Sequence, residues 1–61
     1  MEKYIGIIYY TDGSKSECCP CSGPSAQKTC EIDTARKFEF QKRNMSTYVK
    51  KPTRYEVKKI N

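Results

Sequence analysis

The sequence contains no histidine, no tryptophan and only three glycines, Gly6, Gly13 and Gly23, which lie far apart. Without histidine, the chain lacks the commonest general base and the commonest metal ligand of proteins. The scattered glycines exclude the glycine-rich loop that holds phosphate groups in nucleotide-binding proteins. These absences weigh against an enzyme, and we expect a protein that works by binding.

The chain has 61 residues, which we expect to form a single small domain over 1–61. A domain of this size buries only about 60% of the surface that its unfolded chain exposes, so its core is thin. Little chain is then left to line a catalytic pocket. We expect no organic cofactor, and a metal only at the cysteines.

Long apolar segments are also missing. The longest apolar run, 4–10, has seven residues, whereas a membrane span needs about 20. No segment has the layout of a secretory signal peptide. We therefore expect no membrane partner and an intracellular location, where thiols stay reduced.

Charge is distributed unevenly along the chain. Residues 1–35 hold three lysines against five acids, a net charge of −2, and residues 36–61 hold nine lysines or arginines against two glutamates, a net charge of +7. Such an excess is often no more than a solvated surface. It can also steer a domain toward an acidic partner, either nucleic acid or protein.

The clearest predicted element is a strand over 3–11, which is dense in β-branched and aromatic residues. Asp12-Gly13 follows it and favours a type I′ hairpin turn. We expect the chain to return through 14–17, antiparallel to the first strand.

The rest of the chain is expected to form a loop, a short strand, a helix and a last strand. Residues 18–25 are rich in Pro, Gly and Ser and predict a loop, and 28–32 alternates like a strand. Helix-favouring residues dominate 34–43. After a connection over 44–53, residues 54–60 predict the final strand.

Together these elements predict an α+β fold, a three-stranded, mostly antiparallel sheet with one helix. Asp33 is a good N-cap for that helix. Against the helix, Phe38-Glu39-Phe40 alternates as a strand does. A small all-β barrel is therefore the alternative fold.

Four cysteines form the first candidate site. Cys18 and Cys21 have the spacing with which a tight turn presents two thiolates to zinc. However, the neighbours Cys18 and Cys19 point to opposite sides of an extended chain, and only Cys30 is available as a distant ligand. A structural zinc held by Cys18, Cys19, Cys21 and Cys30, a disulfide between the loop and Cys30, and free thiols all remain open.

The second candidate site lies on the first strand, both faces of which are apolar. One helix covers only one face of a three-stranded sheet, and exposed apolar surface on a small protein marks an interaction site. The other face meets a partner or a second copy, unless the cysteine loop covers it. The two faces are Ile5, Ile7, Tyr9 and Tyr4, Ile8, Tyr10. We predict that Tyr4, Ile8 and Tyr10 bind the partner, with the basic residues Lys50, Lys51, Arg54 and Lys58.

Basic and aromatic residues are also interleaved over 36–55, as in proteins that bind single-stranded nucleic acid. In so short a chain, Phe38 and Tyr55 are more economically used in the core. No signature of a known nucleic-acid-binding module is present. A small basic nucleic-acid-binding module, zinc-stabilised or not, is therefore the alternative function.

In size, composition and layout the chain resembles small accessory proteins of bacteriophages, although no specific motif carries this likeness. In those proteins a sheet-and-helix domain binds one host protein and blocks it. The resemblance implies a viral protein that modulates or inhibits a host protein in the host cytoplasm. A subunit that forms a homodimer through its sheet edge is a further alternative.

Overall fold

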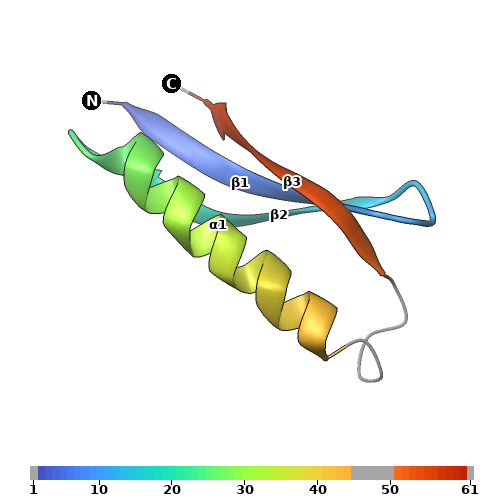
Figure 1. Cartoon of the computed structure of the whole chain (residues 1–61). Helices are drawn as coiled ribbons and strands as arrows, with labels where there is room; N and C mark the ends of the chain where they lie inside the picture. Colours follow the sequence, from blue (N-terminus) through green and yellow to red (C-terminus); the bar gives the residue numbers. More distant parts are fainter. Residues whose placement is uncertain (1, 45–50, 61) are drawn as a thin grey trace.

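The computed structural model of the chain describes residues 2–44 and 51–60. It contains β1 (Lys3–Tyr10), β2 (Lys15–Ser22), α1 (Ala26–Arg43) and β3 (Pro52–Lys59) (Figure 1). The strands form one sheet in the order β2-β1-β3, and β1 pairs antiparallel with both neighbours. The predicted α+β fold is confirmed. The sheet is open, so the alternative of a small barrel is wrong.

The hairpin between β1 and β2 forms as predicted, but its turn is of another type. The backbone N–H of Gly13 donates to the carbonyl of Tyr10 at 3.1 Å, and that of Tyr10 donates to Ser14 at 3.0 Å. Gly13 has a φ of +88°, whereas Asp12 has no positive φ. This is a type I turn followed by a left-handed glycine, not a type I′ turn. The Asp12 carboxylate accepts the Ser14 N–H at 2.9 Å, which holds this turn in place.

The loop predicted over 18–25 is wrong for 18–22, which belong to strand β2, and is correct for 23–25, which connect β2 to α1. Pro20 is tolerated there because β2 is an edge strand and the ladder is bulged at this point. Tyr4 pairs with Cys21 and Gly6 with Cys18, so two residues of β2, Cys19 and Pro20, lie opposite one residue of β1. The bulge absorbs the proline that would otherwise interrupt the pairing.

Helix α1 begins at Ala26, well before the predicted start at 34. The strand predicted over 28–32 is therefore wrong. Asp33, predicted as the N-cap, lies inside the helix. Its buried residues are Ala26, Cys30, Thr34 and Gln41. These positions have helical spacing, but they are small or polar. The buried face of the helix therefore does not appear in the sequence as apolar residues repeated at helical spacing.

The core lies between α1 and one face of β1. Tyr4 and Ile8 are buried, with 8% and 0% of their surface exposed. Between them, a Cβ added to Gly6 would lie 1.9 Å from Oγ1 of Thr34 on the helix. The hydroxyl of Tyr10 donates to Oε1 of Gln41 at 2.8 Å. The even-numbered residues of β1 therefore face the helix.

Strand β3 confirms the predicted last strand, and its Tyr55 packs against Phe38 of α1 with ring centroids 5.2 Å apart. Of the predicted connection over 44–53, residues 45–50 lie outside the described residues, and β3 already begins at Pro52. None of the helices described is long and apolar enough to cross a membrane.

Candidate functional site

The face of the sheet turned away from α1 is covered by no helix or strand within residues 2–44 and 51–60. Its central strand contributes the odd-numbered residues of β1, because successive side chains of a strand point to opposite faces. Residues paired across the ladder share a face, which identifies the neighbours on β2 and β3. We call the following set the open face: Lys3, Ile5, Ile7, Tyr9, Lys15, Glu17, Ser22, Arg54, Glu56, Lys58 and Ile60.

An apolar strip runs along the middle of the open face. Ile7 is only 3% exposed, since it lies between Glu17 and Glu56 in the ladder and between Ile5 and Tyr9 along its own strand. Ile5 and Tyr9 are half-buried. Ile60, at the end of β3 beside the first residues of β1, is 52% exposed. The strip therefore reaches solvent at both ends of the sheet.

Charged side chains flank this strip on both outer strands. The open face holds four cations and two carboxylates, a net charge of +2. All six charged side chains belong to exposed residues. A surface of this kind attracts negatively charged groups while its apolar centre favours burial. The cations are Lys3, Lys15, Arg54 and Lys58, and the carboxylates are Glu17 and Glu56.

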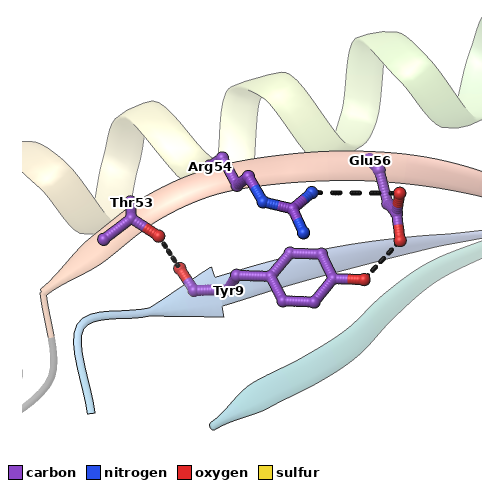
Figure 2. A network of polar contacts seen from close by, with 4 residues as sticks. All are labelled: Tyr9, Thr53, Arg54 and Glu56. Carbon is purple, nitrogen blue, oxygen red and sulfur yellow. Dashed lines mark hydrogen bonds and ion pairs between the residues drawn. The ribbon is translucent and has the colours of Figure 1, made fainter. Parts of the chain in front are cut away.

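A polar network joins β1 and β3 on the open face (Figure 2). The Tyr9 hydroxyl donates a hydrogen bond to Glu56, and the Arg54 guanidinium lies 3.9 Å from that carboxylate and 3.9 Å from the centre of the Tyr9 ring. The hydrogen bond to Glu56 is the main reason why the pKa of Tyr9 is raised. Thr53 adds a bond from its hydroxyl to the Tyr9 carbonyl at 3.3 Å. The network holds a neutral phenol with one face of its ring under a cation.

The predicted partner-binding residues are divided between the two faces of the sheet. Tyr4 and Ile8 are core residues and Tyr10 bonds to the helix, so the prediction that these three form the exposed apolar face is corrected. Arg54 and Lys58 lie on the open face as basic residues.

The two remaining predicted lysines lie near the start of β3. Lys51 is exposed, and its carbonyl accepts the Thr11 N–H at 3.0 Å. Lys50 lies outside the described residues. The predicted basic site and the predicted apolar site therefore do not form one surface.

On the open face, the apolar residues that no helix or strand covers are Ile5, Ile7 and Tyr9, together with Ile60. The sequence did contain an indication of which face of β1 the helix covers. Gly6 shares its face with Tyr4 and Ile8, and a glycine inside a strand often marks a place where another element approaches closely. The face that carries the glycine is the one that the helix covers.

The four cysteines lie where β2 meets α1, and all are free thiols. The thiols of Cys21 and Cys30 donate to the carbonyl oxygen of Cys19, at 3.5 and 3.2 Å. Among the residues that the structure describes, no group of three or more Cys, Asp or Glu side chains is arranged to hold a metal ion. The zinc site at Cys18, Cys19, Cys21 and Cys30 stays a prediction.

Burial controls the acidity of two of these thiols. It raises the pKa of Cys18 to about 11, and a hydrogen bond to Cys19 adds to this rise. Burial also raises the pKa of Cys30, although its hydrogen bond with Thr34 acts in the opposite direction. Because the thiolate is the reactive form, Cys18 and Cys30 are weak nucleophiles at neutral pH.

We expect Cys19→Gly to raise the free energy of unfolding by about 1 kcal/mol, because left-handed backbone costs an L-residue about that much. Cys19 is the single non-glycine residue of 2–44 and 51–60 with a positive φ, +56°. Urea unfolding measures the change. Gly13→Ala, at a φ of +88°, is the matched control and should lower stability by a similar amount. Equal free energies of unfolding for Cys19→Gly and the parent would mean that the backbone at Cys19 is not strained.

Comparisons with family models, with curated proteins and with solved structures found no match to this chain. A function therefore has to be inferred from the open face and from the cysteines.

Proposed function

We propose that this chain is a non-enzymatic binding protein whose open face docks an acidic segment of a partner protein and thereby modulates or inhibits that partner. The apolar strip among flanking cations carries this proposal, and its accessible surface comes from Ile5, Tyr9 and Ile60, since Ile7 is already buried. Apolar residues of the partner would cover the strip, and its carboxylates would pair with the surrounding Lys and Arg side chains. Interfaces commonly combine an apolar centre with a polar rim in this way.

Several contacts favour a protein over nucleic acid as the partner. Single-stranded nucleic acid needs free aromatic rings on which bases stack. Here Arg54 covers Tyr9, while Phe38 contacts both Tyr55 and the ammonium of Lys42, which lies 5.4 Å from its ring. Among the interleaved residues that the structure describes, Phe38, Lys42 and Tyr55 thus contact one another.

A nucleic-acid-binding module remains the second candidate, because residues 36–61 carry a net charge of +7. Association with a second copy is less favourable. The chain has a net charge of +5, and two open faces of net positive charge repel each other. The likeness in size and composition to bacteriophage accessory proteins supports a host protein in the host cytoplasm as the acidic partner.

We expect a ¹⁵N-labelled sample to bind an acidic amphipathic probe peptide of alternating Glu and Val through the open face. Amide shifts should change mainly over β1 and β3, and little along the exposed side of α1. A short single-stranded oligothymidylate serves as the second probe. Tight binding of this oligonucleotide, with affinity falling steeply with salt, would favour the nucleic-acid alternative.

The matched variants reverse two charges on each side of the molecule. Lys3→Glu with Lys58→Glu, both on the open face, should weaken peptide binding about tenfold, mainly by slowing association. Lys28→Glu with Arg36→Glu changes the net charge equally on exposed residues of α1 and should have a much smaller effect. Equal losses for the two pairs would reject the open face as the docking site, because they would report net charge alone.

A further inference from the structure

Cys21 and Cys30 are neighbours in space although they belong to different elements. Both sulfur atoms lie within hydrogen-bonding distance of one oxygen, the Cys19 carbonyl, at 3.5 and 3.2 Å. Cys30 belongs to a buried cluster with Tyr4 and Ala26, and Cys21 packs against that cluster. The edge strand β2 and the helix α1 therefore bring two thiols to one point.

The bulge in β2 creates this arrangement. Cys19 occupies it with a φ of +56°, a conformation that is unfavourable for residues other than glycine. Strained backbone of this kind tends to gather at functional sites, where the surrounding contacts hold it in place. Its carbonyl is the acceptor that the two thiols share.

We propose that Cys21 and Cys30 are a redox-active thiol pair, which a small disulfide such as glutathione disulfide converts into a disulfide bond between β2 and α1. Cys21 is half-buried and Cys30 is fully buried, so Cys21 reacts first. Its sulfur attacks glutathione disulfide, the S–S bond breaks, and the departing glutathione takes up the proton. The Cys30 sulfur then attacks the mixed disulfide held next to it, and the second glutathione departs with the Cys30 proton. Two protein thiols are oxidised and one glutathione disulfide is reduced to two thiols.

The Cys21–Cys30 disulfide is expected to form preferentially only in the folded chain. In an unfolded chain the cost of closing a loop grows with its length, so the short loops Cys18–Cys21 and Cys19–Cys21 would form more readily than Cys21–Cys30. Cys18 is buried outside the cluster that contains Cys30. Preferential formation of the Cys21–Cys30 disulfide would therefore show that the native structure brings these two thiols together.

The test incubates the reduced protein with glutathione disulfide, once under native conditions and once in concentrated urea, and maps disulfides by mass spectrometry. Under native conditions we expect a product that has lost two hydrogen atoms and contains the Cys21–Cys30 bond. In urea the short loops should dominate. The native product should melt roughly 10 °C or more above the reduced protein, because the bond restricts the unfolded chain.

Cys21→Ser removes a half-buried thiol and should abolish this product while the protein stays folded. Cys19→Ala keeps the shared carbonyl and is the matched control, in which the Cys21–Cys30 bond still forms. A native product joined through Cys18 or Cys19, or a folded protein that retains four free thiols, would overturn the proposal. Since the thiol pair lies on the helix side of the sheet, the outcome is independent of peptide binding at the open face.

Discussion

Gly6→Ala should destabilise the protein by about 3 kcal/mol, at the upper end of what overpacking a core costs. The added Cβ would lie 1.9 Å from Oγ1 of Thr34 and 2.8 Å from both its Cβ and Cγ2. Thr34 has no exposed surface, so its side chain has no open space into which to move. Total stability in a domain of this size is on the order of 5 kcal/mol, and urea unfolding should show most of it lost.

Two comparisons separate this collision from the general effect of removing a glycine. Gly13→Ala adds a Cβ that meets no atom within 4 Å, so it should cost only the strain of positive φ, about 1 kcal/mol. In a Thr34→Ala background, Gly6→Ala should cost less than in the parent, because Oγ1 and Cγ2 are gone. Additive effects of Gly6→Ala and Thr34→Ala would mean that α1 does not approach β1 at this point.

Ile8→Ala should cost about 3 kcal/mol, because Ile8 is fully buried under α1 and truncation leaves a cavity. Ile5 is the matched control, since it lies on the same strand with the same side chain but on the open face, where it is half-buried. Ile5→Ala should cost about 1 kcal/mol. Thermal or urea unfolding of the two variants therefore tests which face of β1 the helix covers.

The variants Ile8→Ala and Ile5→Ala also distinguish an effect on stability from an effect on binding. Ile5→Ala is expected to stay folded and to weaken binding of the acidic peptide, since it removes part of the apolar strip. Ile8→Ala should reduce binding only in proportion to the unfolded fraction. Similar stability losses for both variants would contradict the assignment of the two faces.

Local sequence was sufficient for the elements whose pattern is strong. The β-branched and aromatic residues of β1 favour a strand in any environment that buries one side, and β3 is similar. The α+β class follows from these strands and from the helix-forming residues before Arg43. These predictions succeeded because the preferences of neighbouring residues agree with one another.

Helix α1 shows where local pattern was insufficient. Its first turns carry Ala26, Cys30 and Thr34 toward the sheet, and small or polar residues there produce no apolar period. They are buried because β1 presents Gly6 opposite Thr34 and leaves room for the helix to approach. The start of α1, and with it the position of Cys30, depends on that contact between distant segments.

The sequence by itself determined that β1 has two apolar faces and that a single helix can cover only one of them. Tertiary structure decided which face is covered, because the choice depends on packing across the sheet rather than on the hydrophobicity of either set. It also placed Cys21 beside Cys30, since the bulge at Cys19 and the early start of α1 together bring the two thiols to one carbonyl oxygen. A hydrophobic pattern depends only on residues close together in the sequence. The choice of the covered face and the placement of Cys21 beside Cys30 require atoms of separate elements to fit together.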